Sequence, residues 1–274
     1  MILAVVMLVL GVLAYGISGA RLHKGSQAAG GALRSRSWWI GTALQGAGFL
    51  FTLFARRFLP LLIVQACVTS ALAVTAVIQH VQGVRRLRAS DALAILAVVV
   101  GIAALGMVTI TGPPPPIEAR DINVLLGCAA ACALGLLLPG GPVVNGLLAG
   151  FGFSFSAICA RLLIGDHTHV VWRFWELPLL NWVAGMLVIS GMALGQVHLT
   201  KGLARGHAAP VLGCNYGMAT AFPAAFGIGL LGEHTRPGSL PQVVVGLTLA
   251  LAGALWLLRT EDEAGALDGG DAHA

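Results

Sequence analysis

The side chains of this chain that could bind a solute are amides, hydroxyls and imidazoles placed inside long apolar runs. They gather in two regions, near residues 45–80 and near residues 196–220. Groups of this kind recognise a neutral or zwitterionic polar solute, or a lipid head group, by hydrogen bonding. The candidate substrate-binding residues are Gln45, Gln65, Thr69, Asn215 and Tyr216.

The same groups also have a purely structural interpretation. Hydroxyls and amides in membrane helices hydrogen-bond to neighbouring helices, and each such bond contributes under about 1 kcal/mol. We favour this packing role for any single Ser or Thr. For Gln65 and Asn215, which occupy comparable places in two similar segments, packing and solute binding both stay open.

Titratable residues near the ends of the apolar runs are candidates for coupling or gating, namely His80, His198 and Glu233. Imidazole titrates near neutral pH and can relay protons. At the end of a run, however, an ordinary interfacial histidine is the favoured alternative. Glu233, with His234 beside it, is equally well explained as a pair at a helix end.

Composition identifies the elements that must position these residues. The chain is 57% hydrophobic and only 10% charged, whereas a soluble domain carries roughly 25% charged residues. A helix needs about 20 apolar residues to cross a hydrocarbon core of about 30 Å, and lipid offers no partner to an unpaired backbone group. We therefore predict an all-α integral membrane protein with about nine transmembrane helices (8–10), formed by residues 2–20, 38–55, 58–80, 91–110, 122–138, 143–164, 177–197, 209–231 and 240–258.

The runs form a single polytopic membrane domain over residues 1–259, and residues 260–274 form an acidic, Gly- and Ala-rich tail. We expect this tail to be disordered and cytoplasmic, because it has no hydrophobic anchor. The segment Pro139–Pro142 has two interpretations, a tight hairpin between two spans or a break inside a re-entrant pair, and we favour the hairpin.

The distribution of basic residues predicts the orientation. With nine spans and the N-terminus outside, ten Lys and Arg residues fall on one face and five on the other. Positive loops stay in the cytoplasm, so the prediction is a multi-pass inner-membrane protein with the N-terminus outside and the C-terminus inside. The cluster at residues 85–88 is then a cytoplasmic anchor, so no nucleic-acid partner is expected. Arg161 lies within a span, and we expect it to snorkel to the outer surface.

The order of the runs repeats. Residues 38–110 and 177–258 each contain a trio of spans with similar lengths and connections, and the trios begin five spans apart. An odd offset inverts the second trio relative to the first, and inverted repeats with a site near the membrane midplane are typical of secondary transporters.

Six short segments in the two halves of the chain carry a resemblance to a known family. The segments are Trp38-Trp39, Gly46-Ala47-Gly48, Phe58-Leu59-Pro60, Val84-Arg85-Arg86-Leu87, Leu199-Thr200-Lys201-Gly202-Leu203 and Gly232-Glu233-His234. They resemble the EamA/NIPA-like branch of the drug/metabolite transporter superfamily. The resemblance implies the fold of that superfamily, with nine spans and the same orientation. Members of the branch are proposed to move magnesium and related divalent cations, and the wider superfamily moves metabolites, amines and nucleotide sugars.

The chain departs from that resemblance at two acids. Relatives tend to carry an acid where this chain has Phe49, and Asn-Glu-Arg-Leu where it has residues 84–87, so that Glu233 alone keeps the expected carboxylate. A divalent ion needs several oxygen ligands, including carboxylates. Magnesium transport is therefore disfavoured, and we expect no metal site.

These observations predict a secondary transporter that moves a small polar metabolite or lipid head group by alternating access. The main alternative is a non-transporting scaffold or accessory subunit that has lost its coupling acids and binds a second copy or another membrane protein. A carrier would have a midplane cavity lined by Gln65 and Asn215, whereas a scaffold would have both positions packed shut. We expect no enzyme activity and no cofactor, because the chain has no paired-carboxylate, phosphate-loop or nucleophile motif outside its tail. Its abundance of Ala, Gly and Arg suggests a bacterial source.

Overall fold

The computed structural model describes residues 2–74, 77, 89–110, 116–165, 174–206, 208–229 and 235–270. Within these ranges the chain is almost entirely α-helical, and it contains no strand beyond an isolated bridge between Thr109 and Thr235. This confirms the predicted all-α class. The α-helices are α1 (Ile2–Ser26), α2 (Arg36–Arg56), α3 (Leu61–Thr69), α5 (Ala89–Val108), α6 (Ala119–Leu134), α7 (Pro142–Gly165), α8 (Leu179–Arg205), α9 (Ala208–Gly229) and α10 (Leu240–Gly270).

The helices have the length and surface of membrane spans. Among the described residues, five helices are long and apolar enough to cross a bilayer, namely Ile2–Ser26, Arg36–Arg56, Ala119–Leu137, Pro142–Ile164 and Leu179–Arg205. Large apolar side chains point outward from them, such as Met186 and Ile189 on α8. A soluble protein rarely exposes such contiguous apolar surface, so the chain is a membrane protein.

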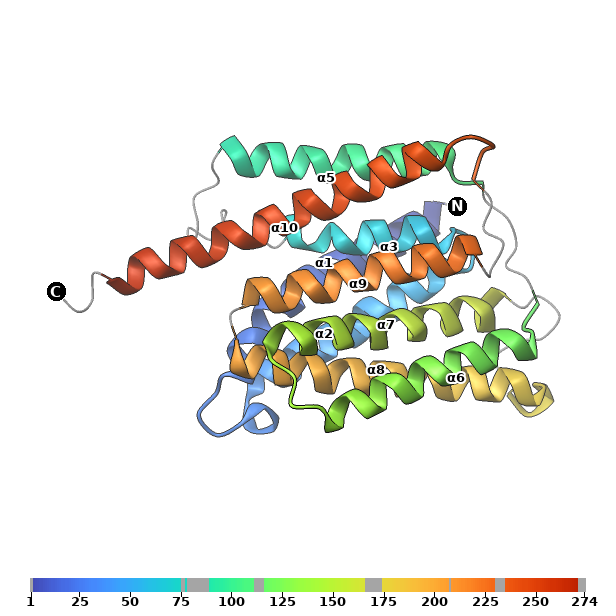
Figure 1. Cartoon of the computed structure of the whole chain (residues 1–274), viewed down its shortest axis with the longest axis horizontal. Coiled ribbons are helices and arrows are strands. Elements are labelled where there is room, and N and C mark those ends of the chain that lie inside the picture. The colour runs from blue at the N-terminus through green and yellow to red at the C-terminus, as the bar shows by residue number, and fades with distance from the viewer. Residues whose placement is uncertain are drawn as a thin grey trace.

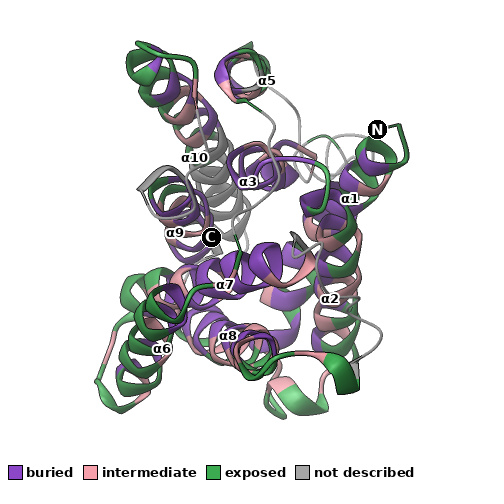
Figure 2. Ribbon diagram, turned by 90° about the vertical axis from the view of Figure 1, so that its right-hand side faces the viewer, coloured by how far each residue is buried: buried purple, intermediate pink, exposed green. Residues whose placement is uncertain are grey.

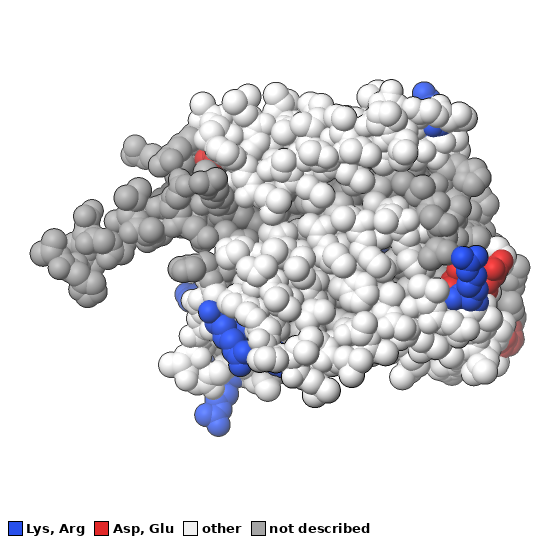
Figure 3. Space-filling view, in the orientation of Figure 1, with Lys and Arg blue, Asp and Glu red and all other residues white. Residues whose placement is uncertain are grey.

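The charged side chains lie at the two ends of the bundle. On the face shown in Figure 3, the described Lys, Arg, Asp and Glu residues occupy the ends, and the broad middle is uncharged. The start of α1 and the end of α10 also lie at opposite ends (Figure 1). This band of uncharged surface between charged ends matches the hydrocarbon core of a bilayer between its head groups.

Helix α7 is the centre of the bundle. In its apolar segment 67% of the residues are buried, against 28–39% in the other four candidate spans. Figure 2, which looks along the helices, shows α7 surrounded by neighbours, with α5 and α6 at the periphery. The closest pairs are α1 with α2, α7 with α8, α5 with α10, and α7 with α9.

Small residues allow these pairs to approach closely. A Cβ atom on Gly152 of α7 would lie 2.8 Å from the backbone nitrogen of Gly195 on α8, and one on Gly101 of α5 would lie 2.5 Å from the carbonyl oxygen of Gly246 on α10. No larger side chain fits at such distances. Close backbone approach of this kind replaces the hydrophobic driving force that helices lack in lipid.

The connection from α6 to α7 is a hairpin between two long helices. After α6, a 3₁₀ turn (Gly135–Leu137) leads through residues 138–141 to Pro142, the first residue of α7, a position that proline favours. The Nδ2 of Asn145 donates hydrogen bonds to the carbonyl oxygens of Gly140 (2.9 Å) and Gly141 (3.1 Å). The favoured hairpin interpretation therefore holds.

The last helix is longer than the sequence predicts. The backbone of α10 stays helical to Gly270, past the expected end at residue 258 and into the segment expected to be disordered. Helix α8 likewise runs to Arg205, eight residues beyond its predicted end at residue 197. Hydropathy locates the part of a helix that lies in lipid, and a helix can continue into water beyond it.

Candidate solute-binding cavity

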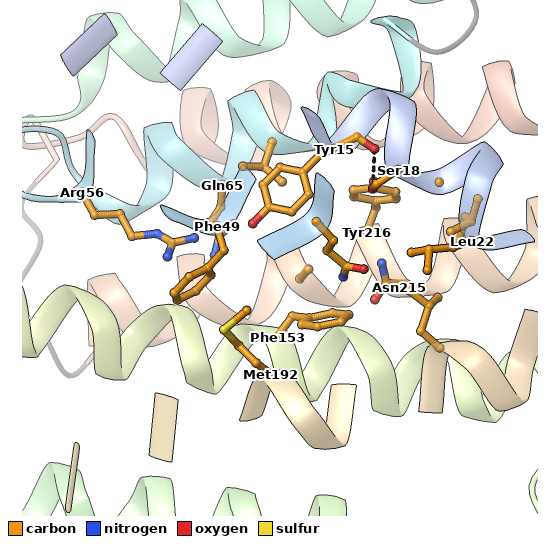
Figure 4. Close-up of a pocket in the computed structure, with 16 residues that line it drawn as sticks. Tyr15, Ser18, Leu22, Phe49, Arg56, Gln65, Phe153, Met192, Asn215 and Tyr216 are labelled. Atoms are coloured by element: carbon orange, nitrogen blue, oxygen red, sulfur yellow. Dashed lines mark hydrogen bonds between the residues drawn. The ribbon is translucent and has the colours of Figure 1, made fainter. Parts of the chain in front are cut away.

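A cavity lies among α1, α2, α3, α7, α8 and α9, with about 50 Å³ open to the centres of water-sized molecules (Figure 4). Part of its wall is apolar, with Phe49, Phe153 and Met192 among the lining side chains. The rest is polar, and none of the described residues that line it is an acid. The polar lining residues are Tyr15, Ser18, Gln45, Arg56, Gln65, Asn215 and Tyr216.

Helix periodicity brings the residues from α2 to the cavity. Gln45, Phe49 and Arg56 are separated by four and seven positions, so they lie along one face of the helix. The same face carries Thr52, which is fully buried and donates a hydrogen bond to the carbonyl oxygen of Phe49 (3.0 Å). One stripe of α2 therefore supplies an amide, an aromatic ring and a cation to the same space.

A hydroxyl pair joins α3 and α9 beside the cavity. The hydroxyls of Thr69 and Thr220 hydrogen-bond to each other. Each hydroxyl oxygen also lies within hydrogen-bonding distance of the carbonyl oxygen four residues earlier in its own helix, that of Gln65 for Thr69 (3.1 Å) and that of Tyr216 for Thr220 (2.9 Å). Since each hydroxyl has one hydrogen, one donates to its own carbonyl group and the other donates to the first hydroxyl. Thr69 is thus a contact between helices and does not line the cavity, whereas Gln65 and Tyr216 do.

The two amides of α2 and α9 have unused hydrogen-bonding capacity. Gln45 and Asn215 are 9% and 5% exposed, and within the described ranges neither Gln45 Oε1 nor Asn215 Oδ1 has a hydrogen-bond partner. A buried polar atom without a partner costs about 1–3 kcal/mol. A bound solute, or water in its place, would remove this cost, because both residues line the cavity.

Arg56 is the functional residue that sequence reasoning missed. We expected it only as a positive charge of the loop after the second span, but it is the last residue of α2 and 2% exposed. Its Cζ atom lies 5.0 Å from the centroid of the Phe49 ring. Its guanidinium lies near the Tyr15 hydroxyl, while its Nε and Nη1 atoms have no hydrogen-bond partner among the described residues. The spacing from Gln45 and Phe49 was the signal that could have found it.

Arg161 also differs from the prediction. It is 2% exposed, so it does not reach the outer surface by snorkelling. Its Nη1 donates a hydrogen bond to the carbonyl oxygen of Arg56 at the end of α2. The prediction was wrong because it placed the side chain against lipid, whereas α7 is the central helix and directs Arg161 toward α2.

His198 lies apart from the cavity, in the contact between α8 and the α6–α7 hairpin. It is fully buried, with Nδ1 3.0 Å from Asn145 Oδ1 and Nε2 3.1 Å from the carbonyl oxygen of Cys132. This arrangement ties three helices together. The other two candidates for coupling or gating, His80 and Glu233, lie outside the described residues.

One end of the cavity is closed by contacts between the two halves of the chain. Trp38 Nε1 donates a hydrogen bond to Thr200 Oγ1 (3.0 Å), and one helical turn away Gln196 Nε2 donates to Thr42 Oγ1 (3.0 Å). Behind these bonds lies an apolar cluster that includes Leu22, Trp38, Leu199, Leu203 and Leu212. These two hydrogen bonds therefore join α2 and α8 at one end of the bundle. At that end α1 and α8 finish and α2 begins.

Comparisons with known proteins give no independent identification: no family model matches the chain, and neither a curated protein nor a solved structure is significantly similar to it. In the parts of the chain that the structure describes, no group of three or more His, Cys, Asp or Glu side chains could hold a metal ion. The function is therefore inferred from the geometry of the cavity.

Proposed function

We propose that this protein is a secondary transporter of the drug/metabolite transporter type, which moves a small polar solute across the membrane by alternating access. The observation that carries the proposal is the cavity inside the apolar bundle. Its polar lining comes from both halves of the chain, with Gln45 and Gln65 from the first and Asn215 and Tyr216 from the second. Small-molecule sites have this character, with a mostly apolar wall and a few convergent polar groups.

The helix contacts support an inverted repeat. If α1, α2, α3 and α5 correspond to α7, α8, α9 and α10, the extensive α1–α2 contact corresponds to the equally extensive α7–α8 contact. Helix α3 then meets its own counterpart α9, and α5 meets α10, as elements on a twofold axis would. The bond between Thr69 and Thr220 joins similar positions, because each hydroxyl oxygen also lies within hydrogen-bonding distance of the carbonyl oxygen four residues earlier.

This correspondence pairs the cavity residues of the two repeats differently from the order of the spans in the sequence. It aligns Gln65 with Tyr216, four residues before each threonine, whereas the order of the spans suggested Asn215 as the partner of Gln65. Both α9 residues line the cavity. The offset of five spans between the two trios is unchanged, and two repeats of opposite orientation around a central site are the architecture that alternating access uses.

Alternating access requires the closed end to open. The bonds of Trp38 to Thr200 and of Gln196 to Thr42 would have to break, and each contributes about 0.5–1.5 kcal/mol. Such bonds are weak enough for a solute to shift the balance between open and closed ends through a modest difference in affinity. We therefore assign α2 and α8 to the gate at this end.

The cavity also bears on the alternative of a non-transporting scaffold. A scaffold would gain from packing Gln65 and Asn215 shut, because buried amide atoms without partners destabilise it. Both residues instead line atom-free space, and Asn215 Oδ1 has no hydrogen-bond partner among the described residues. The geometry thus favours a carrier, whose solute is a small metabolite or the head group of a lipid.

The test is transport by the full-length protein in proteoliposomes. The probes are a mixture of ¹³C-labelled polar metabolites extracted from bacteria, detected by mass spectrometry, and phospholipids with fluorescent acyl chains for head-group translocation. We expect Gln65→Ala and Asn215→Ala each to lower the transport rate at least about tenfold, because each removes a polar contact inside the cavity. The control is Gln242→Ala, an exposed glutamine on α10 that does not line the cavity.

The outcomes separate the two functions. Transport of a probe by the wild type, its loss in both cavity variants and its survival in the control support the carrier. If the wild-type protein moves none of the probes, or both variants move them at the wild-type rate, the proposal is wrong. A wild-type protein that transports nothing and is purified with a second membrane protein in fixed proportion would establish the scaffold.

A further inference from the structure

A buried cation lies at one end of the cavity. Figure 4 shows the Arg56 side chain directed from the end of α2 toward Phe49 and Gln65, with Asn215 and Tyr216 at the opposite end of the group. Arg56 is 2% exposed and lines the cavity, and its Nε and Nη1 atoms have no hydrogen-bond partner among the described residues. Donors on two of the three guanidinium nitrogens are therefore available to a molecule in the cavity.

The surroundings of Arg56 supply no negative charge of their own within the described chain. The side chains that act on it electrostatically are Tyr15, whose hydroxyl lies near it, and Arg161, which carries the same charge. Phe49 lies against its guanidinium group. A cation–π contact with one ring is weaker than the hydration that a buried ion gives up, so the ring offsets only part of the cost of burying the charge.

We propose that the cavity binds an oxyanion, a phosphate or carboxylate group of the solute, on the guanidinium of Arg56. The inference rests on the proposed function and narrows the solute from polar to anionic. A guanidinium keeps its charge when buried and donates strong, charge-assisted hydrogen bonds to the oxygens of a carboxylate or phosphate. The Tyr15 hydroxyl beside it can donate a further hydrogen bond to the same group.

The opposite end of the cavity has complementary chemistry. Gln45 Oε1 and Asn215 Oδ1 are acceptors without partners among the described residues, and they would receive hydrogen bonds from hydroxyl or ammonium groups. The solute therefore carries an oxyanion at one end and hydrogen-bond donors at the other. Glycerol phosphate has this chemistry as a free solute, and the head group of phosphatidylglycerol has it as part of a lipid.

The experiment measures binding by full-length protein in dodecyl maltoside, through the shift of its thermal unfolding midpoint. The probes are glycerol 3-phosphate, inorganic phosphate and uncharged glycerol. The variants are Arg56→Gln, which removes the charge, and Arg56→Lys, which keeps the charge but loses the guanidinium group. The matched control is Arg57→Gln, which changes the neighbouring arginine, an exposed residue against Phe58.

We expect glycerol 3-phosphate to stabilise the wild type and Arg57→Gln at the same concentration, and glycerol to stabilise neither. In Arg56→Gln the affinity for glycerol 3-phosphate falls on the order of thirtyfold, as the loss of a buried charge partner requires, and Arg56→Lys lies between. The inference is overturned if Arg56→Gln binds the phosphate like the wild type, or if glycerol binds as tightly as its phosphate. If Arg56→Gln does not fold, the wild-type comparison and Arg56→Lys decide the question.

A second arm identifies the source of the oxyanion. Mixed micelles with phosphatidylglycerol compete with glycerol 3-phosphate if the cavity takes a lipid head group, whereas phosphatidylcholine micelles do not. Competition by inorganic phosphate without competition by phosphatidylglycerol indicates a free solute. If the protein binds the anion but transports no probe, the proposed function is wrong and the anion site stands. If it transports a neutral solute at a rate that Arg56→Gln does not change, the anion site is wrong and the proposed function stands.

Discussion

Substituting Gly150 by alanine should separate α7 from α9 and disturb the cavity. Gly150 lies where the central helix crosses α9, and a Cβ atom there would be 2.3 Å from the carbonyl oxygen of Asn215 and 2.8 Å from the Cβ of Met218. Real Cβ atoms essentially never come closer than 3.0 Å to another heavy atom, so the backbones must separate by about 0.7 Å at least. Side-chain rotation cannot relieve this clash, because the nearest atom belongs to the backbone.

The cost follows from this displacement. Overpacking of a well-packed interface costs about 1–3 kcal/mol. Since 1 kcal/mol corresponds to about 2–4 °C in the unfolding midpoint of a chain of roughly 150–250 residues, we expect Gly150→Ala to lower the midpoint in detergent by several degrees. The variant should also transport more slowly per folded molecule, because α9 carries Asn215 and Tyr216 away from the other lining residues.

The matched control is Gly217→Ala on α9, where an added Cβ would meet nothing within 4 Å. Alanine is the better helix former by about 1 kcal/mol, so this variant should unfold at the wild-type temperature or slightly above it. The reasoning is refuted if Gly150→Ala is as stable as Gly217→Ala, or if it is destabilised while its transport rate is unchanged. Equal stability of the two variants would show that α7 and α9 do not approach closely at Gly150. Lower stability with an unchanged transport rate would show that this close approach does not position the cavity residues.

Two further predictions concern residues beside the cavity. His198→Ala removes the hydrogen bond that the single N–H of a neutral imidazole donates to one of its two buried oxygen neighbours, Asn145 Oδ1 or the carbonyl oxygen of Cys132. It should lower stability by about 1–3 kcal/mol without changing the rate per folded protein; normal stability with lost transport would instead establish a coupling role. Ala219 on α9 lines the cavity. Trp38→Phe removes one gate bond of about 0.5–1.5 kcal/mol, so a water-soluble thiol reagent should label Ala219→Cys roughly twofold to tenfold faster. Trp39→Phe, whose indole bonds only at the surface, is the control, and equal labelling in both would contradict the gate.

The sequence predicts the helices well because the membrane leaves few alternatives. Long apolar runs must become helices in lipid, and the runs at residues 143–164 and 2–20 correspond to α7 and to most of α1. Helix ends are less predictable, as the extension of α8 to Arg205 shows. A helix that leaves the bilayer is held by contacts with other helices, and those contacts are absent from a hydropathy pattern.

The cavity was predictable only in part, for a related reason. Gln45, Gln65 and Asn215 stand out as amides in apolar runs, and all three line the cavity. His198 stands out in the same way but lies between α6, α7 and α8, because residue type does not tell which face of a helix meets a cavity and which meets another helix. The bonds of Asn145 and Cys132 to His198 depend on that three-dimensional arrangement.

Arg56 shows why the sign of the charge in the cavity was the hardest property to predict. Counting every arginine at the end of an apolar run as a loop charge assumes that helix ends are solvated, and this holds only when no other helix covers them. Here α7 directs Arg161 to the last carbonyl group of α2, so the end of α2 is enclosed and Arg56 turns inward along the stripe of Gln45 and Phe49. A carboxylate at position 49, as the resemblance would suggest, would pair with this guanidinium and leave no charge for a solute. The phenyl ring leaves the cation available, and the residue at position 49 therefore decides which ion the cavity can attract.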